Sequence, residues 1–89
     1  MPKIACTPRL ENVGPVALTD YAGATVGEVL DAVAVDYPRL KNYVLDDQGM
    51  VRKHIAIFVE GVLQPRQTVL NHALRDTDEV YVMQALSGG

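Results

Sequence analysis

The clearest hydrophobic pattern in the chain begins after Thr25. Apolar residues recur there at intervals of three and four positions, which puts them on one side of a helix. Thr25 and Glu28 fit a capping box, in which threonine and a glutamate three positions later bond two amides at the start of a helix. Pro38 ends the helix at or before Tyr37, because proline disfavours a helical residue in front of it. The apolar side of the predicted helix consists of Val26, Val29, Leu30, Val33, Ala34 and Tyr37.

Four other segments show the alternation that is typical of strands. In the last of them, Val80 and Val82 alternate with Tyr81 and Met83. In the third, both alternating sets of side chains are apolar, so this strand should lie inside a sheet. The four segments are residues 3–7, 15–19, 54–60 and 79–84.

Turns and short elements are expected between these segments. Proline, asparagine and glycine predict a turn that joins the first two strands into a hairpin, and Glu60–Gly61 predicts another that leads into a short strand at Val62–Leu63. A further helical turn would direct Leu40, Val44 and Leu45 inward. The remaining expected elements are turns at 8–14, 46–49 and 76–78, and helical turns at 40–45 and 71–74.

The order of elements is therefore strand, strand, helix, strand, short strand, strand. This order is typical of an α+β domain of the ubiquitin-like β-grasp type, a mixed sheet of four to five strands curled around one main helix. The first and last strands of such a domain lie parallel and adjacent in the middle of the sheet. We expect the domain to span residues 1–84 and a flexible tail to span residues 85–89. The expected core contacts join Val29, Leu30 and Val33 to Ile55, Ile57, Val80 and Val82.

Composition excludes several classes of protein. The 89 residues carry a formal charge of −3, and no run of Lys or Arg suggests a nucleic-acid groove. The longest clean apolar run, residues 55–59, is far shorter than the ~20 residues of a membrane span. The first residues also lack the apolar core of a signal peptide. We therefore expect a soluble cytoplasmic protein that binds neither nucleic acid nor a membrane.

The side chains form no catalytic constellation and no metal site. Cys6 is the single cysteine, which excludes a disulfide framework and favours a plain buried thiol. His54 and His72 lack the spacing of metal ligands. The acidic residues at 46–47 and 76–79 are interpreted as turn residues and solvated charges. The chain is accordingly not expected to be an enzyme or to bind a cofactor.

The sequence ends in Gly88 and Gly89. A terminal diglycine arises by chance in roughly one chain in 200, and a frayed end is its ordinary interpretation. The chemical interpretation is that a carboxylate without a neighbouring side chain can pass through a narrow channel and reach an enzyme. The dipeptide alone leaves both interpretations open.

Four stretches together resemble the sulfur-carrier family that includes the small subunit of molybdopterin synthase and the thiamine sulfur carrier (MoaD/ThiS). They follow the family order, whereas the first hairpin matches loosely. Family members often have glycine in the turn before the last strand, where this chain has Thr77. Because a β-branched residue tolerates a positive φ poorly, a different turn type is expected there. The stretches are TVGEVLDAVAVDYPRL at 25–40, HIAIFVEG at 54–61, ALRDTDEVYVM at 73–83 and SGG at 87–89.

The resemblance implies a role for the tail, with Gly89 as the modified residue. A ubiquitin-activating-type adenylyltransferase would use ATP to adenylate the Gly89 carboxylate. Sulfur from a sulfurtransferase or cysteine desulfurase would then give a thiocarboxylate, which donates sulfur to a downstream synthase. The chain would be a carrier and a substrate, or a small subunit of that synthase. Ala85, Leu86, Ser87 and Gly88 would lead Gly89 into the partner's active site, since residues 84–89 reach about 20 Å when extended.

One side of the predicted sheet carries no helix. Tyr81 and Met83 point to that side by alternation, as does Phe58 on another strand. With Leu63 at its rim, these side chains make an apolar patch that a monomer has little reason to expose unless a partner covers it. We predict that Phe58, Leu63, Tyr81 and Met83 form a partner-docking patch that directs the tail at the partner.

Two other functions compete with that of a sulfur carrier. One is a ubiquitin-like modifier whose Gly89 becomes amide-linked to lysines of other proteins. The other is a β-grasp interaction module whose tail is inert. The sulfur acceptor stays open among molybdopterin, the thiazole of thiamine, an amino acid, a tRNA base and a secondary metabolite.

Overall fold

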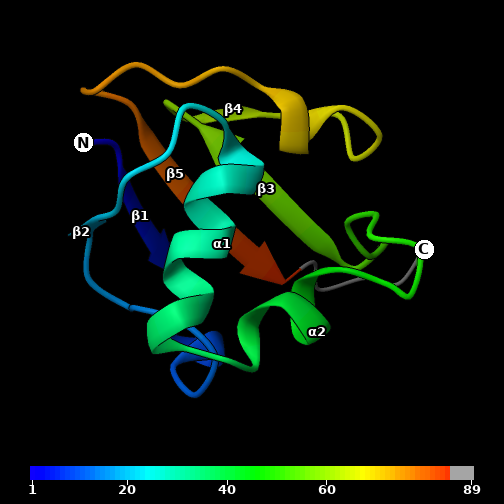
Figure 1. Cartoon of the computed structure of the whole chain (residues 1–89). Helices are drawn as coiled ribbons and strands as arrows, with labels where there is room; N and C mark the ends of the chain where they lie inside the picture. Colours follow the sequence, from blue (N-terminus) through cyan, green and yellow to red (C-terminus); the bar gives the residue numbers. More distant parts are fainter. Residues whose placement is uncertain (85–89) are drawn as a thin grey trace.

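In the computed structural model, which describes residues 1–84, a five-stranded sheet lies against one long helix (Figure 1). The order across the sheet is β2-β1-β5-β3-β4. This is the α+β architecture of a β-grasp domain that the order of elements predicted. The strands are β1 (Lys3–Cys6), β2 (Thr19–Asp20), β3 (Ile55–Val59), β4 (Val62–Leu63) and β5 (Glu79–Gln84), and the helices are η1 (Pro8–Leu10), α1 (Val26–Asp36), α2 (Leu40–Val44) and η2 (Val69–Asn71).

Strand β5 is the middle strand of the sheet. Its residues Glu79–Val82 pair in parallel with β1, and its residues Val80–Gln84 pair antiparallel with β3. The predicted parallel pairing of the first and last strands is therefore confirmed. Strand β3 has neighbours on both sides, as its two apolar faces predicted.

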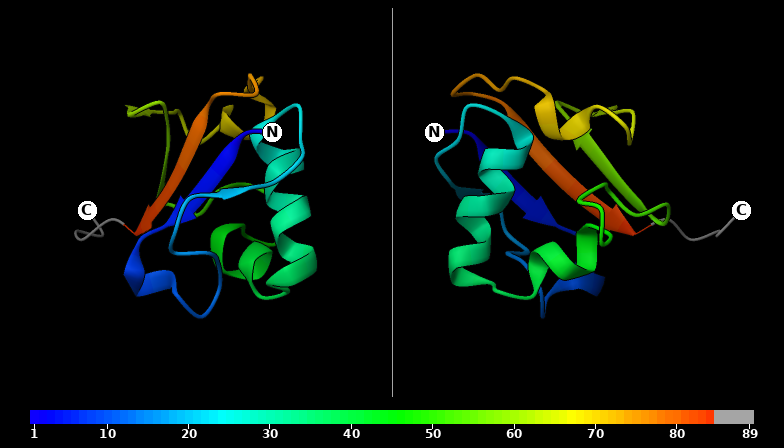
Figure 2. Two further views of the ribbon diagram at one scale, coloured as in Figure 1. Left: turned by 90° about the vertical axis from the view of Figure 1, so that its left-hand side faces the viewer. Right: turned by 45° about the vertical axis from the view of Figure 1, so that its right-hand side comes forward.

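Helix α1 begins at the predicted capping box. Thr25 Oγ1 accepts a hydrogen bond from the Glu28 amide at 3.2 Å, and Glu28 Oε1 accepts one from the Ala24 amide at 2.9 Å. The helix ends at Asp36, just before the Tyr37–Pro38 step. Figure 2 shows α1 packed across one face of the sheet, with the strands as a separate layer.

The core lies between α1 and the facing side of the sheet. The predicted contact residues of both layers are all buried, and Leu30 of α1 is 1% exposed. The expected second helical turn is confirmed as α2, with Leu40 and Val44 buried and Leu45 half-buried. The buried set predicted from the sequence is Val29, Leu30, Val33, Ile55, Ile57, Val80 and Val82.

The prediction of a second hairpin strand at residues 15–19 is wrong over most of its length. Strand β2 contains Thr19 and Asp20 alone, whereas residues 15–18 form no strand. Val16 and Leu18, which would have alternated in that strand, are 43% and 46% exposed. The alternation therefore belonged to an exposed loop.

The loop after β1 moves away from the sheet because part of it enters the core. Leu10 and Val13 are 1% and 4% exposed, although the sequence predicted a plain turn there. Gly14 packs so closely on Cys6 that an added Cβ would lie 2.6 Å from the sulfur. Position 14 therefore has no room for a side chain. The loop is part of the core.

The other turns differ from expectation in small ways. The helical turn expected at residues 71–74 is the 3₁₀ helix η2, shifted toward the N-terminus because Val69 is its buried anchor. In the turn between β3 and β4, Glu60 and Gly61 both have positive φ, at 50° and 78°, as a tight hairpin turn requires. Among residues 1–84, no helix has the length and apolar character needed to cross a bilayer.

Candidate functional site

The predicted modified residue, Gly89, lies outside the described residues, as do the tail residues Ala85, Leu86, Ser87 and Gly88. What the structure gives is the base from which this segment starts. The base is the end of β5, where Gln84 is paired with Ile55 of β3. Two residues earlier, the Val82 carbonyl accepts a hydrogen bond from the Thr7 amide at 2.9 Å. The segment therefore follows directly on the strand at the centre of the sheet.

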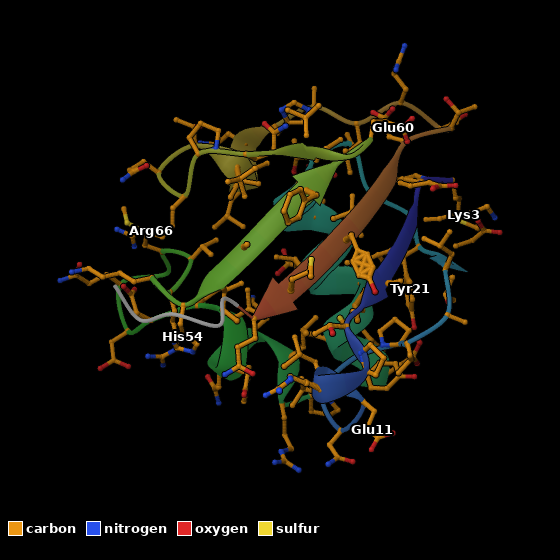
Figure 3. The ribbon with its side chains drawn as sticks, turned by 180° about the vertical axis from the view of Figure 1, so that it is seen from behind. Lys3, Glu11, Tyr21, His54, Glu60 and Arg66 are labelled. Carbon is orange, nitrogen blue, oxygen red and sulfur yellow. The ribbon has the colours of Figure 1, made fainter. Side chains whose placement is uncertain are left out.

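The sheet register brings the four residues of the predicted docking patch together. Phe58 of β3 lies opposite Leu63 of β4 on one side and opposite Tyr81 of β5 on the other. Met83 lies two residues beyond Tyr81 on the same face. Figure 3 looks at this face, with the strands in front and α1 behind them. The docking function of the patch is a prediction, whereas its assembly into one surface is observed.

Exposure within the patch is uneven. Leu63 and Met83 are 58% and 39% exposed, while Phe58 and Tyr81 are half-buried. The rim residues Leu63 and Met83 therefore offer most of the free apolar surface of the patch. A partner would therefore gain burial mainly at Leu63 and Met83.

Two small residues lie on the same face of the sheet as the patch. Ala5 of β1 pairs with Tyr81, and Ala56 of β3 pairs with Met83. Ala5 is 3% exposed and Ala56 is half-buried, so both add little free surface to the patch. Alternation along the third predicted strand already placed Ala56 on the face of Phe58. Ala5 was missed, because its pairing with Tyr81 depends on a register that the sequence did not define.

Charged groups lie at both ends of the strands, and Lys3 stands at the same end of the sheet as Glu60. In Figure 3, His54 and Arg66 lie toward the end of the sheet where β5 finishes, and Glu60 lies at the opposite end. The Glu60 carboxylate accepts a hydrogen bond from the Glu79 amide at 2.7 Å, which fixes the start of β5. The His54 ring makes an edge contact with Tyr43, with ring centroids 6.5 Å apart. Arg66 and the His54–Tyr43 ring pair thus lie toward the end of the sheet where β5 finishes.

The turn before β5 is closed by Asp78 instead of glycine. The Asp78 carboxylate accepts hydrogen bonds from the Arg75 amide at 2.9 Å and from the Arg75 guanidinium at 3.3 Å. The hydrogen bond from the Arg75 backbone amide is the main reason why the pKa of Asp78 is lowered. Thr77 does not have a positive φ, so the expectation of a different turn type is met. Asp78 is 4% exposed, and its interpretation as a solvated charge was wrong because the carboxylate is the capping group of the turn.

The remaining candidate side chains have structural roles. Cys6 is fully buried, as predicted, and its burial raises the pKa of the thiol to about 11. The Asp46 carboxylate accepts hydrogen bonds from the amides of Gln48 and Met50 within its own turn. Within the part of the chain that the structure describes, no three potential metal ligands gather in one place.

A β-grasp sheet whose central strand is followed, after three further residues, by a diglycine is typical of ubiquitin-like carrier and modifier proteins. The model of the ThiS family matches residues 11–89, and the chain belongs to this family. Proteins of this family are small carriers, not catalysts, so the chain is a sulfur carrier or a ubiquitin-like modifier. A comparison with curated protein sequences found no match.

Solved structures agree with this assignment. SAMP1 from Haloferax volcanii is 27% identical, with a TM-score of 0.73, over 99% of this chain and 98% of that one. SAMP1 from Methanosarcina acetivorans is 22% identical, with a TM-score of 0.82, over 99% and 95%. The structure of the BexX/CysO complex from Amycolatopsis orientalis matches with 19% identity and a TM-score of 0.84, over 100% of both chains. The last two likenesses establish the shared fold.

Proposed function

We propose that this protein is a sulfur carrier whose Gly89 carboxylate is adenylated by an ATP-dependent activating enzyme and converted to a thiocarboxylate. The observation that carries the proposal is the extent of the family match, which runs through residue 89 and includes the diglycine. The thiocarboxylate would pass its sulfur to the acceptor of a downstream synthase. Molybdopterin and thiamine precursors are the acceptors that the family resemblance brings forward.

The chemistry explains why the tail needs glycine. A carboxylate is a poor electrophile, because its charge is delocalised and oxide is a bad leaving group. Attack of a carboxylate oxygen on the α-phosphorus of ATP releases pyrophosphate and gives an acyl-adenylate. A sulfur nucleophile then displaces AMP from the carbonyl carbon. Gly88 and Gly89 carry no Cβ, so their backbone can lie close to the nucleotide phosphates.

Deletion of Gly89 tests this step. The variant should lose ATP–pyrophosphate exchange with the cognate activating enzyme, because the shortened chain ends one residue away from the α-phosphate. Its stability should stay within about 0.5 kcal/mol of the parent, because Gly89 lies beyond Gln84, the last paired residue of β5. Ser87→Ala serves as the matched control, because it alters the same tail without changing its length. Persistent exchange with the deletion variant would refute the assignment.

A second function is supported by the names of two similar structures, which are both small archaeal modifier proteins. In that function the activated Gly89 carbonyl would form an amide bond with a lysine of another protein. The mass of the free protein from cell extract distinguishes the two. A gain equal to the difference between sulfur and oxygen indicates a thiocarboxylate, and a ladder of heavier adducts that disappears on deletion of Gly89 indicates conjugation. A tail that carries neither would leave an interaction module.

The docking patch is tested separately, with two variants in the patch and one matched methionine control outside it. Met83→Asp and Phe58→Asp should weaken binding to the activating enzyme in titration calorimetry, because they put a charge on a surface that the partner must desolvate. Met50→Asp is the control, since Met50 is 37% exposed, like Met83 at 39%, but lies in the loop before β3. Circular dichroism confirms that each variant is folded. Equal affinities of Met83→Asp and Met50→Asp would place the docking surface elsewhere.

A further inference from the structure

A groove lies beside β3, on the side away from β5, where Figure 3 shows Arg66. Its volume is about 370 Å³, within the range of about 300–1,000 Å³ that is typical of binding pockets. One wall is the first half of β3, and the other is the chain that follows β4. The lining is mostly apolar and includes Val51, Ile55, Ala56, Ile57, Leu63, Pro65 and Val69.

The backbone of β3 is already engaged along this groove. The Ile55 amide donates a hydrogen bond to the Arg52 carbonyl at 3.0 Å, and the Ile57 carbonyl accepts one from the Gln64 amide at 3.0 Å. Ala56, between them, is paired with β5. An added strand therefore finds no ladder to extend here, and an occupant has to bind through its side chains. A helix suits such a site, because its own backbone groups are bonded internally.

The size of the groove limits what enters it. One turn of a helix with its side chains, about 5.4 Å long and about 10 Å across, fills about 420 Å³, which exceeds the volume of the groove. A partner helix would therefore lie over the groove and insert one or two apolar side chains. Leu63 lines the groove and is 58% exposed, so an inserted side chain would bury it. Leu63 also belongs to the docking patch, so the groove is continuous with that surface.

The charges at the border of the groove select the polar residue of the partner. Lys53 and Arg66 line the groove, whereas no carboxylate of the described residues does. Within residues 1–84, neither cation lies within ion-pair distance of a carboxylate. The Arg66 guanidinium donates a hydrogen bond of 2.8 Å from Nη1 to the Val51 carbonyl, which fixes the position of its charge. The pKa of Asp46 is lowered mainly by the hydrogen bond from the Met50 amide and to a smaller extent by Arg66, so this carboxylate is engaged in its own turn.

We propose that this groove docks a helix of a partner protein, which inserts an apolar side chain and places a carboxylate against Lys53 and Arg66. Side chains three or four positions apart on a helix lie about 5–6 Å from each other. The partner helix should therefore carry a large apolar residue and, three or four positions away, an aspartate or glutamate. Such recognition reads the side chains of one helix face, as in other cases of a helix in a groove. None of these observations involves Gly89, so the proposal does not depend on the chemistry of the tail.

The test uses the full chain labelled with ¹⁵N and a blocked peptide of about 17 residues, long enough to form a helix in water. The peptide consists of alanine and glutamine with one leucine and, four positions later, one glutamate. Amide shifts should be concentrated at Ile57, Gln64, Arg66 and Val69. Alanine in place of the peptide's leucine should weaken binding by at least about tenfold, the effect of losing one buried leucine side chain. Glutamate placed two positions from the leucine, on another face of the helix, should bind as weakly as a peptide without glutamate.

Charge variants identify the border of the groove. Lys53→Glu should weaken binding of the glutamate peptide by about two- to fivefold, the effect of losing one exposed ion pair. Arg9→Glu makes the same change in net charge on η1 and should leave the affinity unchanged. Arg66→Gln should also weaken binding, and it keeps a donor for the Val51 carbonyl. A peptide with lysine in place of glutamate should reverse the order and bind Lys53→Glu more tightly than the parent.

Each contrary outcome overturns the proposal. Equal binding of the glutamate and lysine peptides would remove the charge selection, and equal binding with glutamate on either helix face would remove the helical spacing. Shifts centred on Tyr81 and Met83 would assign the peptide to the outer face of the sheet. Absence of shifts up to the solubility limit of the peptide, or an equal effect of Lys53→Glu and Arg9→Glu, would show that the groove does not dock such a helix.

Discussion

Two valines of α1 offer a direct measurement of how much burial stabilises this fold. Val33 is fully buried against the sheet, whereas Val35, two positions later in the same helix, is 81% exposed. Substitution by alanine removes the same atoms at both sites. Any gain in helix propensity, at most about 0.7 kcal/mol, is also common to both. The difference between Val33→Ala and Val35→Ala therefore isolates the burial of the side chain.

The expected difference follows from the atoms removed. Valine loses two carbon groups on truncation to alanine, and each is worth about 0.8 kcal/mol when buried, which gives about 1.6 kcal/mol. The cavity left beside the sheet adds to this, so the two variants should differ by about 2 kcal/mol. In a domain of this size about 2 kcal/mol corresponds to roughly 8–16 °C in the midpoint of thermal unfolding. Total stability is expected at about 4–13 kcal/mol for 89 residues, so the effect is a large share of it.

Urea denaturation and calorimetry measure this difference on the two purified variants. Val35→Ala should unfold within about 0.5 kcal/mol of the parent, as most surface substitutions do. Midpoints of Val33→Ala and Val35→Ala that agree within a degree or two would refute the assigned packing of α1. A larger loss in Val35→Ala than in Val33→Ala would mean that the helix is rotated about its axis.

Three further predictions concern single polar groups. Thr25→Ala should cost about 1 kcal/mol in urea denaturation because the Glu28 amide loses its acceptor, and Thr25→Ser should restore most of it. The lowered pKa of Asp78 means that its stabilising effect is present above the pKa of the unfolded carboxyl, about 4, and is lost as pH falls through the lower folded value. Asp78→Asn should therefore be less stable at neutral pH and show a smaller loss of stability on acidification, with an unchanged acid dependence as the contrary result. Since burial raises the pKa of Cys6 to about 11, iodoacetamide should label the native protein only as fast as it unfolds, and rapid labelling of folded protein would contradict its position in the core.

Local signals explain why α1 and the central strands could be predicted from the sequence. The capping box at Thr25 and the recurrence of apolar residues act within a few positions of each other, so no distant contact is needed to establish them. The alternation in β5 is similarly local, and it also gave the orientation of Tyr81 and Met83. The residues of the docking patch could thus be predicted from the sequence once the side of each strand that faces the core was known.

The parts that were missed depend on contacts between distant segments. Leu10 and Val13 lie in a stretch that looks like a turn, yet they are buried because the loop folds under the sheet beside Leu40. Their burial draws the chain away from the sheet edge and shortens β2 to two residues. No local pattern in the sequence encodes these long-range contacts.

The stability of β5, from which the tail starts, should not depend on the tail. Because β5 is bonded to β1 on one side and β3 on the other, opening it requires both ladders to separate, which amounts to unfolding the domain. Native-state hydrogen exchange should therefore find the amides of Val80–Val82 among the slowest, exchanging with the free energy of global unfolding. The amides of β4, whose side chains Val62 and Leu63 are 61% and 58% exposed, should exchange through smaller openings. Deletion of Gly89 should leave the protection of β5 unchanged, since the change lies beyond the last pair, Ile55–Gln84. If the deletion instead lowered the protection of Val80–Val82, the tail would be part of the cooperative unit, and its modification would alter the fold that partners recognise.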